Sequence, residues 1–177
     1  MGWRSGDVVV INALWNGNSM IRLDPMSAAQ LEAFLASSIQ EYAEEHVRSG
    51  GWDSAQALEK SRSEHARLLP KGVDTPDTYL RILTDPDSGV RVGEVWYVLQ
   101  REGSSTRIWI YWIGIEEKYR RHGYAESTLH QLEGEGRRLG ADRVTLHVFG
   151  HNAAARSLYS KLGYEATNVV MSKKISL

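Results

Sequence analysis

The chain has no cysteine, no long hydrophobic run and almost no net charge. Without a thiol it has no disulfide, no thiolate metal site and no cysteine nucleophile. Its longest apolar run, Ile108 to Ile115, is far shorter than the roughly 20 residues that a membrane-crossing helix needs. Because the formal net charge is -1, we expect neither nucleic acid nor a membrane as a partner, and any affinity for anions must be local.

Two hydrolase motifs, G-x-S-x-G and H-E-x-x-H, are also absent. His147 and His151 are four residues apart, but Gly150 separates them and no third ligand has recognisable spacing, so we expect no metal. Residues 1–19 lack the pattern of a secretory signal, and we interpret them as a loosely held extension. We expect a cytoplasmic protein whose residues 20–177 form a single domain.

Apolar periodicity predicts a chain that alternates between strands and helices. Ser27 is placed to cap a helix that buries Leu31 and Phe34 and ends at Gly50, and a second capped helix starts at Asp53. The other predicted elements are strands at 20–23, 79–83, 90–99, 108–115, 143–149 and 169–175, and helices at 124–139 and 152–162.

This order of elements predicts an α/β protein of the α+β type, with a mixed sheet and helices on both faces. The strands at 79–83 and 90–99 are expected to form an antiparallel hairpin. The helix at 124–139 joins two strands, 108–115 and 143–149, which should therefore lie parallel and side by side. A ligand held at Gly123 would lie at the carboxyl end of the first of these strands.

The segment 108–125 joins an apolar strand to a glycine turn and the start of a helix. Such a junction suits a diphosphate, because unpaired amides point outward at a helix start and Gly123 has no Cβ to keep a ligand away. Arg120 and Arg121 add positive charge, while His122 either contacts phosphate or is merely exposed. The alternative is a solvated basic turn.

Two motifs that follow one another along the chain resemble the acyl-CoA-binding core of the GCN5-related N-acetyltransferases (GNAT). They are Arg120-x-x-Gly123-x-Ala125 after a strand, and Asn152-x-x-Ala155-x-x-Leu158-Tyr159-x-Lys161-x-Gly163-Tyr164 downstream. The resemblance covers roughly residues 79–175, and the last part also looks like a bacterial subgroup of uncharacterised members. It implies a GNAT-like fold with a mostly antiparallel sheet, a splayed parallel strand pair and acetyl-CoA as co-substrate. Glu117 and Ala125 depart from the common proline and glycine of the family.

The resemblance also implies roles for individual residues. The backbone of Ile113 and Ile115 would pair with the pantetheine arm as an added strand, and the Ile113 N–H would polarise the thioester carbonyl. Tyr159 would protonate the departing thiolate. The implied cofactor-binding residues are Ile113, Ile115, Arg120, Arg121, His122, Gly123, Tyr124, Ala125, Glu126, Ser127, Asn152, Ala155 and Tyr159.

The general base is not evident from the sequence. An acceptor amine with a pKa of about 10.4 must lose a proton before it attacks, yet strand 108–115 has no carboxylate. The candidates are Glu41, Glu45, Glu94, His147 or a chain of waters. The carboxylates at 41, 44 and 45 attract a cationic amine, or they are simply a solvated helix face.

We therefore expect an N-acetyltransferase that moves an acetyl group from acetyl-CoA to a primary amine of a small molecule or peptide, by direct transfer in a ternary complex. The alternative is a non-catalytic acyl-CoA-binding sensor or interaction module. Trp109, Tyr111 and Trp112 are of a type that more often belongs to a core than to a binding site. Alternation along the strand places Trp109 and Tyr111 on the face opposite Trp112, so the alternative is that one of these faces lines the acceptor site. The sequence leaves the oligomeric state open, with a homodimer as one option.

Overall fold

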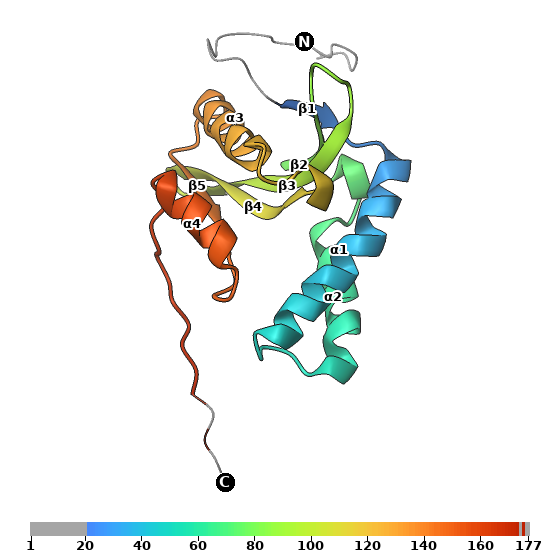
Figure 1. The fold of residues 1–177 in the computed structure, drawn as a ribbon, viewed down its shortest axis with the longest axis vertical. Helices are drawn as coiled ribbons and strands as arrows, with labels where there is room; N and C mark the ends of the chain where they lie inside the picture. The colour runs from blue at the N-terminus through green and yellow to red at the C-terminus, as the bar shows by residue number, and fades with distance from the viewer. Residues whose placement is uncertain (1–20, 174, 176–177) are drawn as a thin grey trace.

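The computed structural model describes residues 21–173 and 175 (Figure 1), so the predicted extension at 1–19 lies outside the described residues. Its elements run along the chain in the order β1 (Arg22–Pro25), α1 (Ala28–Arg48), α2 (Ser54–Leu68), β2 (Thr78–Thr84), β3 (Arg91–Glu102), β4 (Ser105–Ile115), α3 (Tyr124–Arg138), β5 (Arg143–Leu146) and α4 (Ala153–Lys161). Short 3-10 turns lie at Gly72–Asp74 and Glu117–Tyr119. The predicted alternation of strands and helices is confirmed, with one exception near the carboxyl end.

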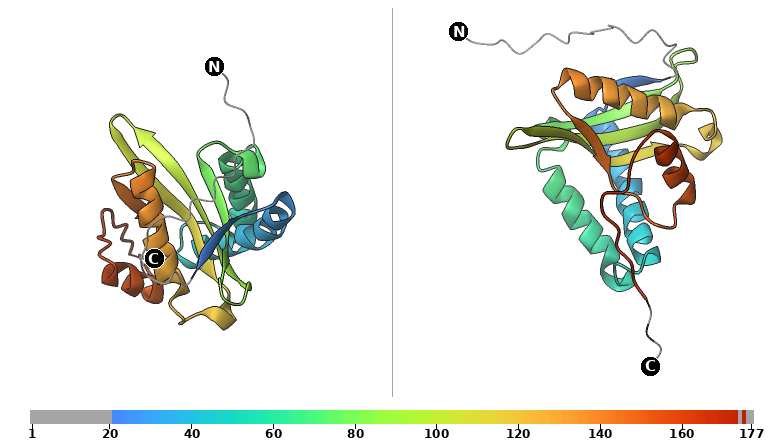
Figure 2. Two further views of the ribbon diagram at one scale, coloured as in Figure 1. Left: turned by 90° about the horizontal axis from the view of Figure 1, so that it is seen from above. Right: turned by 90° about the vertical axis from the view of Figure 1, so that its left-hand side faces the viewer.

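The strands form one sheet in the order β1-β2-β3-β4-β5. The first four strands are antiparallel, and β4 and β5 are parallel, as predicted from the helix that connects them. Helices α1 and α2 lie on one side of the sheet and α3 lies on the other, with α4 beside β5 (Figures 1 and 2). The mixed sheet with helices on both faces is therefore confirmed.

Two apolar cores lie on opposite faces of this sheet. The core on the α1 side, hereafter the α1-side core, consists of Met26, Leu31, Phe34, Leu69, Leu80, Ile82 and Trp96. The core under α3, the α3-side core, consists of Ile21, Leu83, Val92, Val95, Tyr97, Leu99, Ile108, Ile110, Leu129 and Leu132. Side chains of α4 also contact the α3-side core. Because α3 and α4 share one core, the loops that precede them are held in a fixed relation.

The two helices of the amino-terminal half begin where the sequence predicts. Ser27 accepts a hydrogen bond from the Gln30 amide, and the Gln30 side chain accepts one from the Ser27 amide, so α1 starts with a complete capping box. The Asp53 carboxylate accepts from the Ala55 amide at 2.9 Å at the start of α2. The stripe of α1 that includes Leu31 and Phe34 is buried against the sheet, as its periodicity indicates.

A β-bulge in β4 overturns the predicted alternation of its aromatic residues. Trp96 of β3 lies opposite Trp112, but its neighbour Tyr97 lies opposite Ile110, so Tyr111 is an extra residue without a partner position. As a result Tyr111 and Trp112 both pack against the α1-side core instead of facing opposite sides. After the bulge the apolar side chains of β4 return to the α3-side core.

The predicted last strand at 169–175 is absent from the described residues. Residues 165–173 and 175 have no strand partner, and β5 itself ends at Leu146 instead of residue 149. Val169, Val170 and Met171 are 70%, 93% and 89% exposed. The β-branched composition of this segment favours a strand, but a strand also needs a neighbouring backbone, and this copy of the chain provides none to the segment.

Candidate functional site

The parallel strands β4 and β5 are paired over only part of their length. Their pairing runs from Arg107 opposite Arg143 to Ile110 opposite Leu146, whereas β4 continues to Ile115. The bulge at Tyr111 lies immediately after the last pair, and bulges bend a strand and increase its twist. Beyond Ile110, therefore, the edge of β4 that had faced β5 has no strand partner among the described residues.

The peptide groups of Ile113 and Ile115 face this open edge. The Glu116 amide donates to the Val92 carbonyl of β3 at 2.9 Å, and the Gly114 carbonyl is directed at Gly93 of β3. Because successive residues of a strand direct their peptide groups to opposite edges, those of 113 and 115 point away from β3. The Ile115 carbonyl already accepts from Arg120 Nε at 3.0 Å, so Ile113 remains the better-placed residue for an added strand.

A cradle of backbone amides follows at the carboxyl end of β4. The Arg120 amide donates to the Glu117 carbonyl and the Ser127 amide donates to the Gly123 carbonyl, but the amides of residues 121–126 donate to no acceptor in the described chain. Gly123, the residue that begins α3, has a φ of 82° and provides no side-chain cap. We call residues 121–126 the amide cradle. Consecutive free amides at a helix start form a concave site for an anion.

Arg121 adopts a strained backbone conformation inside this cradle, with a φ of 66°. A non-glycine residue in a sparsely populated region of φ and ψ costs about 1–3 kcal/mol, and such strain is concentrated at binding sites. The His122 ring donates from Nδ1 to the Arg120 carbonyl at 2.8 Å, which leaves its other nitrogen toward solvent. The predicted residues Arg120 to Ser127 are thus brought together, although the amides of Arg120 and Ser127 are already used.

Two side-chain contacts hold the cradle in place. The Tyr124 hydroxyl donates to Asp85 in the turn between β2 and β3, and this bond is the largest of the contacts that together lower the pKa of Asp85 to about 2. Lys161 of α4 donates to both carboxylate oxygens of Glu126 at 2.8 and 2.9 Å, which lowers the pKa of Glu126. The second contact also offsets the negative charge of Glu126, which otherwise opposes an anion at the first turn of α3.

The second motif of the sequence has a structural role as well as a predicted functional one. Asn152 Oδ1 accepts from the Ala155 amide at 3.1 Å, so these two residues form the cap of α4. Tyr159 packs against the α3-side core together with Ile113, and burial raises the pKa of its hydroxyl. No described residue forms a hydrogen bond with that hydroxyl, so it is available to a ligand.

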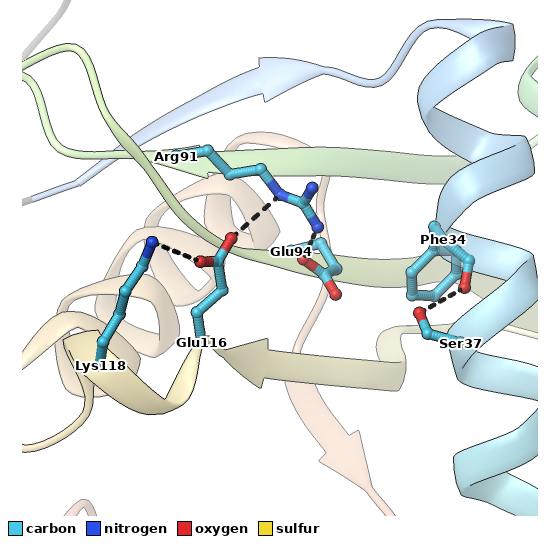
Figure 3. Close-up of polar contacts among 6 residues, drawn as sticks. All are labelled: Phe34, Ser37, Arg91, Glu94, Glu116 and Lys118. Carbon is cyan, nitrogen blue, oxygen red and sulfur yellow. Dashed lines mark hydrogen bonds and ion pairs between the residues drawn. The ribbon is translucent and has the colours of Figure 1, made fainter.

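Glu94 is the base candidate on β3, the strand that pairs with the open part of β4. It lies opposite Gly114, one residue from Ile113, and its side chain is 12% exposed. Figure 3 shows Arg91 between Glu94 and Glu116, at 2.7 and 3.7 Å from their carboxylates, with Lys118 on the far side of Glu116. Arg91 was not singled out in the sequence, and it fixes the position of the Glu94 carboxylate.

Glu41 of α1 is a further base candidate, and charged groups near β4 and the cradle affect its pKa. Partial burial raises the pKa of Glu41, the carboxylate of Glu94 raises it further, and the guanidinium of Arg120 opposes these effects. Glu41 therefore lies within the electrostatic influence of Glu94 on β3 and of Arg120 in the loop before the amide cradle. A carboxylate with a raised pKa is a stronger base than a solvated one.

The other two base candidates lie elsewhere. Glu45 forms ion pairs with His151, in the loop before α4, and with Arg48 at 2.9 Å. The His147 side chain is exposed and its ring meets that of Phe149 edge-on, at 5.0 Å. Glu45 therefore links α1 to the loop before α4.

The indole of Trp112 is a further polar group on the α1 side that the sequence assigned to the core. Its Nε1 atom is buried and has no hydrogen-bond partner among the described residues. A Cβ placed on Gly114 would lie 2.7 Å from this nitrogen, so the indole covers the glycine that faces Glu94. A buried indole N–H normally has a partner, and this one is a free donor beside the open strand.

Comparisons with known proteins agree with this geometry. A profile of the acetyltransferase (GNAT) family matches residues 39–164. The chain is similar to two uncharacterised N-acetyltransferases of Bacillus subtilis (strain 168). YdgE is 36% identical over 86% of this chain and 97% of its own length, and YycN is 37% identical over 88% and 99%.

Solved structures show the same fold. A crystal structure of YycN from Bacillus subtilis has a TM-score of 0.83 at 36% identity and covers 89% of this chain and 99% of its own. A GCN5-related N-acetyltransferase from Ralstonia eutropha JMP134 has a TM-score of 0.62 at 17% identity, over 88% and 98%. Within the described part of the chain, no group of three or more His, Asp or Glu residues could hold a metal ion, and no helix is long and apolar enough to span a membrane.

Proposed function

The chain belongs to the acetyltransferase (GNAT) family, and from this premise we propose that it moves an acetyl group from acetyl-CoA to a primary amine by direct transfer in a ternary complex. One observation carries the proposal: the amide cradle lies at the carboxyl end of a strand whose open edge includes Ile113. Acetyl-CoA would supply the activated thioester. The steps below concern what the residues of this chain do.

The amide cradle suits the diphosphate of acetyl-CoA, and the open edge of β4 suits its pantetheine arm. The free amides of residues 121–126, with the charges of Arg120 and Arg121, would bind the diphosphate. The peptide group of Ile113 would pair with the amides of the pantetheine arm, because an unpaired strand edge accepts an extended chain as an added strand. The hydrogen-bonding groups in both places belong to the backbone, so this part of the binding depends on the shape of the turn, and the two arginines add only charge.

Ile113 and Tyr159 would act on the reacting atoms. The Ile113 N–H would donate to the thioester carbonyl and stabilise the negative charge that develops on its oxygen. Tyr159 would donate its proton to the sulfur as the carbon–sulfur bond breaks. Since burial raises the pKa of Tyr159, its hydroxyl stays protonated near neutral pH and is present as a donor.

Glu94 would accept the proton of the acceptor amine, directly or through water, with Glu41 beside it. Glu94 lies opposite Gly114 and is held by Arg91 at 2.7 Å, so its carboxylate has a fixed position next to the reacting part of β4. The raised pKa of Glu41 makes its carboxylate a stronger base than a fully solvated glutamate. Both carboxylates also favour a cationic acceptor through their charge.

Thiol release is the direct test, and the absence of cysteine removes the protein's own background. The purified chain would be mixed with acetyl-CoA and a panel of amines, polyamines and peptides, with CoA binding measured separately by calorimetry. Binding together with amine-dependent thiol release supports the proposal. Binding without turnover on any acceptor would replace it with the sensor function, and no binding at all would overturn both.

A further inference from the structure

A cavity lies at the opposite end of β4 from the amide cradle. Its volume is about 420 Å³, and it is lined by Gln100, Glu102, Ser105, Arg107 and Arg143. Arg107 is near the start of β4 and Ile113 is near its end, so six residues of strand, or roughly 20 Å, separate the cavity from the open edge. The turn between β3 and β4 is exposed and extends past the helices (Figure 2), so solvent reaches this end of the sheet.

Two arginines on neighbouring strands lie side by side in this cavity. The register of the parallel pair places Arg107 of β4 opposite Arg143 of β5. Residues paired in this way direct their side chains to the same face of a sheet, and like charges in such positions repel each other. An anion between the two guanidinium groups would turn this repulsion into attraction.

A neighbouring side chain holds each guanidinium group by its Nε atom. Gln100 Oε1 accepts from Arg107 Nε at 2.9 Å, and Asp142 Oδ1 accepts from Arg143 Nε at 2.8 Å. No described residue accepts a hydrogen bond from the Nη atoms of either arginine. Because the amide oxygen of Gln100 is used, its NH₂ group remains as a further donor. The two arginines are thus oriented while most of their N–H groups stay available to a ligand.

The other polar groups around the cavity leave these donors available. The Arg107 guanidinium lies over the ring of Trp109, 5.2 Å from its centroid, which restricts its movement. Ser105 donates to the second carboxylate oxygen of Asp142 at 3.0 Å, so both oxygens of Asp142 are engaged. Glu102 is 83% exposed and lies 3.8 Å from Arg107 Nη2. Such a long, exposed ion pair contributes little, so a ligand can replace it.

We propose that this cavity binds a small oxyanion, with its phosphate or carboxylate group between Arg107 and Arg143. Guanidinium groups present paired N–H donors that match the oxygens of both kinds of group. The volume lies in the range of small-molecule sites, so the cavity has room for an organic anion as well as for inorganic phosphate. The site is separate from the amide cradle, and this inference does not depend on the proposed reaction.

Nuclear magnetic resonance of the isotope-labelled protein tests the proposal at the site itself. Inorganic phosphate, a sugar phosphate and succinate are each titrated at constant ionic strength, with chloride as the reference anion. Every titration is repeated with saturating CoA, so that an anion bound at the amide cradle is displaced. We expect the amide signals of residues 100, 107 and 143 to shift in a saturable way with at least one of the three anions. The anion that binds most tightly identifies the preferred group.

CoA should leave these shifts unchanged, because the cradle and the cavity lie at opposite ends of β4. The absence of a saturable shift with all three anions would overturn the proposal. So would shifts that CoA abolishes, since the anion would then occupy the cradle.

Three substitutions in the cavity add a second measurement. Arg107→Gln and Arg143→Gln should each weaken anion binding at least tenfold. Gln100→Glu should do the same, because its carboxylate can still accept from Arg107 Nε but adds a negative charge to the cavity. Circular dichroism verifies that each variant is folded. Affinity equal to that of the wild type in all three variants would overturn the proposal.

Arg101→Gln is the matched control for charge. Arg101 follows Gln100 on β3, so alternation directs its side chain to the other face of the sheet, and it pairs with Asp77 at 2.8 Å. This variant loses the same formal charge as Arg107→Gln, yet its affinity for the anion should equal that of the wild type. An equal loss of affinity in Arg101→Gln and Arg107→Gln would show that binding follows the overall charge, which would contradict a site between Arg107 and Arg143.

Discussion

β4 has two sides that are built from different kinds of group. Toward β5 and the amide cradle it offers backbone N–H groups, whereas on the side toward α1 the polar groups are side chains: the indole of Trp112 on β4 itself, Glu94 of β3 and Glu41 of α1. Backbone groups are set by turn geometry and accept many sequences, whereas side-chain groups change with every substitution. Under the proposed function, the cradle side would bind the donor and the α1 side would determine which amine is used.

The largest expected effect is on the α1 side, where Glu94→Gln removes the proposed base. We expect kcat/KM to fall by about 10²–10⁴-fold, because general bases contribute rate factors of this size. The affinity for CoA should not change, since the cradle is untouched. Turnover and calorimetry on the same preparation measure both quantities.

Glu116→Gln is the matched control, because Glu116 shares Arg91 with Glu94 but lies beyond the end of β4. Its activity should remain near that of the wild type. If both variants lose activity equally, the ion-pair network around Arg91 is what matters and Glu94 is not the base.

On the cradle side the largest effect is expected for Tyr159→Phe. Removing the hydroxyl should lower kcat about a hundredfold while the ring keeps its packing against the α3-side core. Steady-state kinetics with saturating donor separate this loss from any change in KM. Unchanged turnover would exclude Tyr159 as the proton donor.

Gly123→Ala should act on donor binding rather than on the chemical step. A φ of 82° costs an alanine about 1–2 kcal/mol, and a shift of the first amides of α3 should weaken CoA binding about tenfold. At saturating donor, kcat should be retained.

Gly103→Ala is the matched variant for strain alone, since Gly103 also has a positive φ, 59°, and lies in the turn between β3 and β4 with open space around it. It should lose stability to a similar extent while its CoA affinity remains normal. If CoA binding is weakened in both Gly123→Ala and Gly103→Ala, the loss of affinity comes from general destabilisation of the protein.

The smallest effect concerns pH and the contact that anchors the cradle. The Tyr124 bond is the largest of the contacts that lower the pKa of Asp85 from 3.8 to about 2, so its stabilising effect is present above pH 3.8 and is lost as pH falls toward 2. Tyr124→Phe should therefore lower Tm near neutral pH and make little difference near pH 2. Thermal melts of the wild type and of Tyr124→Phe between pH 2 and pH 7 test this prediction. A difference in Tm that does not change with pH would contradict the link between the Tyr124 bond and the charge of Asp85.

Sequence patterns predicted most of this fold, because the helix caps and apolar patterns of single segments favour the same elements that the packed structure contains. Ser27 and Asp53 cap the helices that their positions indicate, and the crossover from 108–115 to 143–149 is parallel as its helix requires. The prediction that Tyr111 and Trp112 face opposite sides of the sheet was wrong. A bulge depends on the pairing of two strands, and the sequence of one strand does not specify that pairing. The prediction of a strand at 169–175 was wrong for the described residues, because strand propensity does not specify which strand the segment pairs with.

For the candidate site, the sequence by itself determined the amide cradle, because Gly123 and the residues around it are contiguous and their geometry is local. Only the tertiary structure decided which acid lies beside it. Arg91 and Glu94 are neighbours in β3, where the register places residue 94 opposite residue 114, whereas Glu41 is distant along the chain and lies within the electrostatic influence of Glu94 because α1 packs on this face of the sheet. Contacts within a turn follow from backbone geometry alone, whereas contacts between elements depend on how buried faces fit together.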